Sequence, residues 1–335
     1  MGNNQQNDQQ NDQQNDKPIK VLVVGGGGYI GSGVVEILLE RKIPFSVYDV
    51  LLYEHQYLKP VDFIYGDIRD TEKLAKILPN YTHVVWLAAV VGDTACQINP
   101  SLSMAINKEA VKWLAEHFRG RIIFMSTCSV YGQYDQIADE SSPPNLLSLY
   151  AQTKYQAEQH LKGTNHLIFR LGTVYGLSDI HYCRLRMDLV LNFMTASAMT
   201  KGKLQVFGGE QWRPLVHVKD VALVVVDNLE NSACGIYNLA TSNYQMKDLA
   251  NEISKVTGCG IELVQRKFED QRSYKASVEK IKRDGLLKLE KIRDAEYGIK
   301  EIANLINSGR IKDIYNDLYF NDRYLKNYFK NGKFF

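Results

Sequence analysis

The sequence has no long apolar run, little net charge and few cysteines. Its 335 residues include five cysteines, an odd number, and none of them forms a Cys-x-x-Cys pair. This pattern argues against structural disulfides and a zinc site and favours a reducing compartment. No apolar run approaches the roughly 20 residues of a membrane span. The formal net charge of +2 favours neither nucleic acid nor a membrane surface as a partner. We therefore expect a cytoplasmic protein without a metal ion, a nucleic-acid partner or a membrane anchor.

The N-terminal segment contains a polar repeat, Asn7–Gln10 followed by Asn11–Gln14, with no apolar side chain. Such a segment cannot bury enough surface to offset the entropy lost on ordering. It also lacks the basic start and apolar centre of a signal peptide. Residues 1–16 are therefore predicted to be a disordered tail.

Short apolar runs alternate with helical patterns in the first half of the chain. We expect strands over residues 19–24, 45–48, 62–65, 83–88, 122–126 and 167–171, and helices over 29–40, 71–78, 102–118 and 149–161. This alternation predicts an α/β fold, a Rossmann-type doubly wound parallel sheet.

A glycine-rich turn joins the first predicted strand to the first predicted helix. Gly25, Gly28 and Gly31 fit a G-x-x-G-x-x-G frame, with Tyr29 and Ile30 between the last two. Without side chains, the main-chain N–H groups can approach a dinucleotide pyrophosphate at the start of the helix. The turn therefore predicts a dinucleotide cofactor.

The second predicted strand ends at Asp49. A carboxylate at this position accepts hydrogen bonds from both hydroxyls of the adenosine ribose and repels a 2′-phosphate. Asp49 therefore predicts NAD rather than NADP.

A tyrosine and a lysine, Tyr150 and Lys154, lie four residues apart on the predicted helix 149–161. At that spacing their side chains share one helix face. We expect the ammonium to lower the pKa of the phenol, so that the phenol can shuttle a proton near neutral pH. Together with the glycine-rich turn, the pair predicts an enzyme that moves a hydride and a proton.

Beyond residue 176 the alternation loosens and the elements shorten. We expect an NAD-binding Rossmann domain over residues 17–176 and a smaller C-terminal substrate-binding lobe over 177–310, with residues 216–228 and 236–239 returning to the sheet. Residues 311–335 are rich in Tyr, Phe, Lys and Asn. They predict an aromatic and basic tail that packs on its own domain or on a partner in a homodimer.

Several further motifs occur in order along the chain: Gly66-Asp67-Ile68, Leu87-Ala88-Ala89, Ser126–Gly132, Arg170–Gly176 and Arg213–Asp220. With these motifs, the chain from about residue 19 to about residue 308 resembles the extended short-chain dehydrogenase/reductase family. Within it, the resemblance is to the NAD-dependent epimerase/dehydratase group that acts on nucleotide sugars. The loop 90–96 and the stretch 184–188 resemble a sub-branch that includes capsule heptose and deoxysugar enzymes. The implied substrate is a nucleotide-diphosphate sugar.

The resemblance also implies roles for individual residues. Cofactor contacts are implied for Asp67 and Ile68 beside the adenine and for Leu87, Ala88 and Ala89 on the nicotinamide side. Thr127 is implied to bond the reacting sugar oxygen, Tyr150 to be the catalytic acid or base, and Lys154 to hold the nicotinamide ribose. Arg213 and Arg272 match positions that bind the nucleotide diphosphate.

The chain departs from the family pattern at three positions. Thr173 replaces the Asn that usually contacts substrate. Family dehydratases follow the catalytic Thr with Asp-Glu, whereas here Cys128 and Ser129 follow it, and a neutral pair is poorly suited to eliminating water.

We therefore expect an epimerase that transiently oxidises the sugar C4 hydroxyl. A dehydrogenase or reductase with net redox is the alternative, and a 4,6-dehydratase or a non-catalytic NAD-binding protein is less favoured. Cys96 and Cys128 are expected near the pocket as small packing residues.

Overall fold

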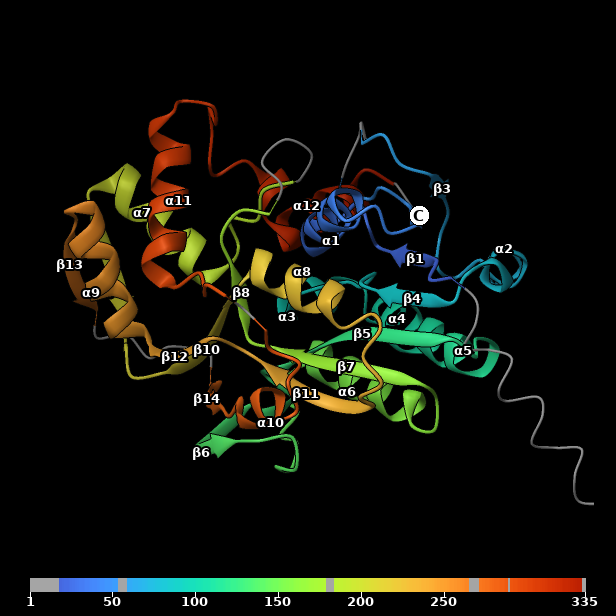
Figure 1. Cartoon of the computed structure of the whole chain (residues 1–335). Helices are drawn as coiled ribbons and strands as arrows, with labels where there is room; N and C mark the ends of the chain where they lie inside the picture. The colour runs from blue at the N-terminus through green and yellow to red at the C-terminus, as the bar shows by residue number, and fades with distance from the viewer. Residues whose placement is uncertain (1–17, 54–58, 179–183, 265–270, 289, 333–335) are drawn as a thin grey trace, which may run out of the picture.

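The computed structural model describes residues 18–53, 59–178, 184–264, 271–288 and 290–332. The predicted disordered tail, residues 1–16, lies outside the described residues. Figure 1 shows a central parallel sheet with helices on both faces and a smaller group of helices and strands beyond one end of it. In the described ranges, no helix has the length and apolar character needed to cross a membrane.

The central sheet has seven parallel strands in the order β11-β7-β5-β4-β1-β2-β3. Their bounds are β1 Val21–Val24, β2 Phe45–Asp49, β3 Phe63–Tyr65, β4 His83–Trp86, β5 Arg121–Thr127, β7 His166–Leu171 and β11 Gly235–Leu239. The order reverses between β1 and β4, which makes a crevice at the carboxyl ends of these two strands, where ligands bind in such sheets. The predicted α/β fold is confirmed, and β11 adds a seventh strand at the edge.

Helices cover both faces of this sheet. On one face, α1 (Tyr29–Glu40) packs against α8 (Val218–Asp227) over a shared apolar cluster. On the other face, α2 (Thr71–Ile77), α5 (Ala110–His117) and α6 (Leu149–Leu161) bury their apolar sides against the sheet. Most of residues 216–228, which were expected to return to the sheet, form α8 on one of its faces, and only the start of this segment lies in a strand; residues 236–239 lie in β11 of the sheet.

The helix predicted over residues 102–118 is interrupted. It consists of α4 (Pro100–Met104), a π-helical turn η3 (Ala105–Glu109) and α5. Within the π-turn, Asn107 is buried; its Oδ1 accepts from the Val90 main-chain N at 2.8 Å, and its Nδ2 donates to the Val90 O at 2.9 Å. The π-turn thus carries an asparagine that holds the loop after β4, a use of such turns that is common near functional sites.

The smaller group of elements contains three short sheets. They pair β12 (Ser242–Gln245), β10 (Trp212–His217) and β8 (Thr173–Tyr175); β13 (Gly260–Val264) and β9 (Lys203–Phe207); and β14 (Ser273–Ala276) and β6 (Gln133–Ala138). Helices α7 (Val190–Lys201), α9 (Met246–Thr257) and α11 (Ala295–Asn307) pack around a second core that includes Tyr175 and Leu215. The domain boundaries at residues 176 and 310 stay predictions.

The remaining short elements are η2 (Leu78–Asn80), α3 (Asp93–Ile98), η4 (Cys128–Tyr131), α10 (Glu279–Arg283), η5 (Asp317–Tyr319) and α12 (Asn321–Lys330). Of these, α12 packs against α3, and its Leu325 is only 1% exposed in the cluster beneath the central sheet. The last described helix therefore packs on the part of the chain that forms the central sheet, on the face opposite α1.

Candidate active site

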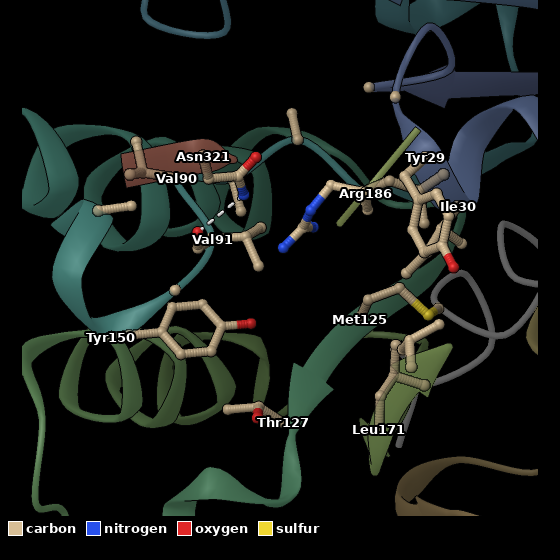
Figure 2. A pocket seen from close by; sticks show the side chains of 18 of the residues that line it. Tyr29, Ile30, Val90, Val91, Met125, Thr127, Tyr150, Leu171, Arg186 and Asn321 are labelled. Carbon is tan, nitrogen blue, oxygen red and sulfur yellow. Dashed lines mark hydrogen bonds between the residues drawn. The ribbon is translucent and has the colours of Figure 1, made fainter. Parts of the chain in front are cut away.

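A cavity of about 610 Å³ lies at the carboxyl ends of the central strands. Every residue that the sequence assigned to the site lines it: Gly25, Gly28, Tyr29, Ile30, Gly31, Asp49, Asp67, Ile68, Leu87, Ala88, Ala89, Thr127, Tyr150, Lys154, Thr173, Arg213 and Arg272. The structure thus brings these residues together, while the role of each stays a prediction. Figure 2 shows Tyr150, Thr127 and Tyr29 around this cavity.

The glycine-rich turn is packed too closely to accept side chains at two positions. Gly25 has φ +86°, and a Cβ placed on it would lie 2.5 Å from the Ala88 N. A Cβ on Gly31 would lie 2.3 Å from the Gly25 O. Helix α1 begins after Gly28 with no side-chain cap, so its first N–H groups are available to an anion. The turn therefore fits a dinucleotide pyrophosphate.

Asp49 is fixed beside this turn. Its Oδ2 accepts from the Gly27 N at 2.9 Å and its Oδ1 from the Leu51 N at 2.7 Å. Burial raises the pKa of the Asp49 carboxyl, and the main-chain N–H bonds partly oppose this effect. The carboxylate stands at the end of β2, where an adenosine ribose would lie.

Asp67 follows β3 on the same side of the cavity. Burial alone would raise its pKa, but hydrogen bonds from Arg69 hold the pKa of this carboxyl below its ordinary value. The Arg69 Nη2 lies 2.5 Å from the Asp67 Oδ2, and the Tyr48 hydroxyl donates to the Asp67 O at 2.7 Å. The turn, Asp49 and Asp67 together form a cradle that NAD fits.

Tyr150 and Lys154 lie one turn apart on α6, with the Tyr150 hydroxyl pointing into the cavity (Figure 2). Burial raises the pKa of Tyr150, and Cys96 and Asp93 raise it further. Burial lowers the pKa of Lys154 to about 7, and its Nζ lies 4.0 Å from the centroid of the Phe124 ring.

The expectation that Lys154 lowers the pKa of Tyr150 is wrong: burial raises this pKa, and the charged side chain that opposes the rise is Arg186. Both groups are buried, so phenolate and ammonium are each disfavoured relative to their neutral forms.

The last residue of β5 and the turn η4 after it offer hydroxyls to the cavity. The Thr127 Oγ1 accepts from the Ser129 N at 3.0 Å, and the Ser129 Oγ lies 3.3 Å from the Tyr274 hydroxyl. Cys128 is fully buried outside the cavity lining, and its Sγ donates to the Arg170 O at 3.2 Å. Burial raises the pKa of this thiol. Neither residue after Thr127 therefore supplies a carboxylate to the cavity.

An ion pair connects a predicted diphosphate-binding arginine to the helix of Tyr150. The Arg272 Nη1 lies 2.6 Å from the Asp93 Oδ2. The Asp93 Oδ1 accepts from the Ser148 hydroxyl at 2.6 Å, and Ser148 caps the N-terminus of α6. The Arg213 guanidinium donates to the Arg272 main-chain O. Arg213 and Arg272 are therefore connected through Asp93 and Ser148 to the helix that carries Tyr150.

Sequence reasoning missed a second set of charged residues on the cavity wall. Arg184, Arg186 and Asp188 line the cavity, as does Asn321 from the start of α12. Residues 184–188 were noted only for a resemblance to a sub-branch of the family, although charged residues at every second position of this stretch were a usable signal. Asn321 carried no local signal, because its contacts are made with residues far away in the sequence.

The chain is similar to known proteins along most of its length. Residues 21–240 match the model of the NAD dependent epimerase/dehydratase family. The UDP-glucose 4-epimerase of Halalkalibacterium halodurans is 28% identical over 292 residues, which cover 78% of this chain and 87% of the relative. The CDP-paratose 2-epimerase of Salmonella typhi is 23% identical over 320 residues, covering 78% and 92%.

Solved structures share the fold across most of the chain. The Thermus thermophilus UDP-glucose 4-epimerase in complex with NAD superposes with a TM-score of 0.72 at 27% identity, covering 88% of this chain and all of that one. The dTDP-glucose 4,6-dehydratase DesIV of Streptomyces venezuelae, at 24% identity and a TM-score of 0.73, covers 87% and 98% and shows the fold alone.

Proposed function

The chain belongs to the NAD dependent epimerase/dehydratase family, and within it we propose that the protein is a nucleotide-sugar epimerase that transiently oxidises the sugar C4 hydroxyl. NAD is its cofactor, as in the family and in the Thermus thermophilus relative. The similarity to UDP-glucose 4-epimerases supports UDP-glucose as the first substrate to test. The single observation that carries the proposal is the convergence of Tyr150 and Thr127 on one cavity with no carboxylate at positions 128 and 129.

In this proposal the chain's own residues manage the proton. Thr127 holds the reacting hydroxyl by a hydrogen bond, and Tyr150 takes its proton and later returns it. Because burial raises the pKa of Tyr150, the phenol needs nearby positive charge before it can act as a base. Lys154, four residues along the same helix, supplies that charge when it is protonated. Bound NAD would accept the hydride from the sugar carbon and give it back.

Two arginines on the cavity wall would hold the substrate at its diphosphate end, and this affects which product is released. Arg213 and Arg272 would hold the nucleotide diphosphate, because a guanidinium binds phosphate oxygens in a fork. Held at that end alone, the oxidised sugar can turn and present its other face before the hydride returns, which gives an epimer with no net redox. If the ketosugar leaves instead, the protein is a dehydrogenase or reductase, which is the alternative.

Elimination of water is disfavoured by the same geometry. Among the cavity-lining carboxylates, Asp93 contributes to the raised pKa of Tyr150. Its two oxygens are engaged by Arg272 and Ser148. With both oxygens engaged, Asp93 has no free carboxylate oxygen to offer a leaving hydroxyl.

Mass spectrometry with chromatography tests the proposal. The purified protein with NAD is incubated with UDP-glucose and with a panel of other nucleotide sugars, with Tyr150→Phe as the inactive control. We expect a product of unchanged mass that separates from the substrate. A mass change of two hydrogens supports the alternative, and a product lighter by one water contradicts both. A homodimer and a cytoplasmic location remain part of this proposal; the family resemblance supports the first and the odd number of cysteines supports the second.

A further inference from the structure

Asn321, the first residue of α12, connects three segments around the cavity. Its main-chain N donates to the Asp188 Oδ2 at 3.1 Å, and its Nδ2 donates to the Val91 O at 3.0 Å. Its Oδ1 accepts from the Arg184 guanidinium. The residue is only 4% exposed. The C-terminal helix is therefore joined to the loop after β4 and to the segment 184–188.

The same helix also touches the segment that follows Asp49. The Tyr324 hydroxyl donates to the Leu52 O at 2.8 Å, and the rings of Tyr324 and Tyr53 lie 5.0 Å apart. The Arg184 guanidinium lies 3.9 Å from the centroid of the Tyr53 ring. Because Leu52, Tyr53, Asn321 and Arg184 all line the cavity, α12 forms part of its wall.

Arg186 is the charged group that this wall presents to the cavity. Its Nε and Nη2 lie 2.6 and 3.0 Å from the two carboxylate oxygens of Asp188, which Asn321 also binds. Figure 2 shows its guanidinium pointing into the cavity between Tyr29 and Tyr150. Its Cζ lies 5.9 Å from the centroid of the Tyr29 ring, at the start of α1. Within the described residues, the Nη1 of Arg186 has no hydrogen-bond acceptor.

We propose that Arg186 donates to a pyrophosphate oxygen of the ligand in this cavity, and that Asn321 is the positioning residue that holds it there. Asp188 binds the Nε and Nη2 of Arg186 and leaves the Nη1 directed into the cavity. The guanidinium is therefore oriented before the ligand arrives. Such an oriented donor loses little freedom on binding. The main-chain N of Asn321 binds Asp188, and its side-chain amide binds Val91 and Arg184.

Two ligands supply a pyrophosphate here, the dinucleotide and the nucleotide sugar. Arg186 lies between the start of α1 and Tyr150 (Figure 2). A dinucleotide pyrophosphate would bind at the start of α1, and the sugar would react beside Tyr150. The dinucleotide arm of the test depends only on family membership, whereas the nucleotide arm rests on the proposed function. Binding measurements on the two ligands therefore separate failure of this inference from failure of the proposed function.

The experiment uses the full chain with Arg186→Gln, Asn321→Ala and the double variant. Asn327→Ala is the matched control, since Asn327 is exposed on the same helix and binds Asp317 away from the cavity. NADH binding is followed by fluorescence in cofactor-stripped protein, and UDP binding by calorimetry in NAD-loaded protein. Melting temperatures are recorded for every variant.

We expect Arg186→Gln to weaken binding of one ligand by about 10- to 100-fold, as for loss of a hydrogen bond from a charged donor. Asn321→Ala should weaken the same ligand several-fold, and the double variant should bind no worse than Arg186→Gln. In turnover with UDP-glucose, the loss should fall on KM or on NAD retention, with kcat of the loaded enzyme changed less than about threefold.

The ligand affected identifies the source of the pyrophosphate. Unchanged NADH and UDP binding in Arg186→Gln would overturn the inference. Additive losses in the double variant would overturn the positioning role of Asn321, since additivity means that the two residues act independently. A fall in binding and melting temperature of equal size in Asn327→Ala would also overturn it, because the effect would then belong to the helix and not to Asn321.

Discussion

The carboxylate of Asp49 is hydrogen-bonded to the main chain of the glycine-rich turn, with its Oδ2 2.9 Å from the Gly27 N. A second bond, from the Leu51 N at 2.7 Å, holds the other oxygen. The side chain therefore cannot swing aside without losing main-chain partners. A ligand that brings negative charge to this place would meet a fixed carboxylate.

Cofactor selectivity follows from this arrangement. The protein should bind NADH at least about tenfold more tightly than NADPH, a difference of about 1.4 kcal/mol, which is modest for a phosphate against a carboxylate. Asp49→Asn should reduce the ratio of NADH affinity to NADPH affinity, because the amide has the size of the carboxylate but no negative charge. Calorimetry on wild type and variant measures both, and equal affinities in the wild type would remove Asp49 from this role.

Gly31→Ala should abolish tight NADH binding. Its new Cβ would lie 2.3 Å from the Gly25 O, so the main chain of the turn must move. Gly260→Ala is the matched control, because a Cβ there meets nothing within 4 Å. Fluorescence titration with NADH checks the pair. Equal affinity in Gly31→Ala and wild type would show that the turn can shift without losing its fit.

Tyr150→Phe should lower turnover of the accepted nucleotide sugar by about a hundredfold or more. A positioned proton shuttle contributes about 10²- to 10⁴-fold, whereas the ring that packs in the cavity is kept. Binding of UDP and NADH should stay close to wild type. Steady-state rates and calorimetry measure the two effects separately. A variant with near-normal turnover would mean that another group transfers the proton.

Lys154→Met should stabilise the cofactor-free protein while removing activity. Burial lowers the pKa of Lys154 from 10.5 to about 7, so between these pH values the unfolded chain binds a proton that the folded chain does not. Wild-type stability therefore rises with pH across this window, and below about pH 7 the burial penalty is complete. The variant lacks this penalty.

Thermal melts from pH 6 to 10 test the sign of this effect. The variant should melt a few degrees above wild type near pH 7, and the difference should shrink toward pH 10. Glu109→Gln serves as a control for general charge effects, since Glu109 forms an exposed ion pair with Lys108, and such pairs contribute little. A variant less stable than wild type at pH 7 would contradict the assigned cost of burying Lys154.

Local sequence patterns predicted the central fold well. The helices carrying Tyr29 and Tyr150 begin and end at the predicted residues, because apolar periodicity and flanking turn residues are local signals. The break at Asn107 could not be predicted, since the π-turn accompanies a contact with Val90 in another segment. The small parallel pairs, such as β6 with β14, join residues far apart in sequence. Such pairing leaves no periodic signal in either strand.

The site was predictable where chemistry has a fixed spacing. The glycine frame and the Tyr150–Lys154 pair could be identified without the fold, and they line the same cavity. The pKa shifts of these residues could not be predicted from the sequence, because the raised pKa of Tyr150 comes from burial that only packing creates. Asn321 illustrates the same limit, since its importance comes from partners at positions 91, 184 and 188.

The placement of Asn321 also bears on how the protein matures. During synthesis the N-terminal part of a chain folds first. The glycine-rich turn and the helix of Tyr150 can therefore form before residue 321 has emerged from the ribosome. The wall that α12 supplies is then the last to arrive. The cavity would be complete only after α12 has emerged, because Asn321 and Asp322 line it.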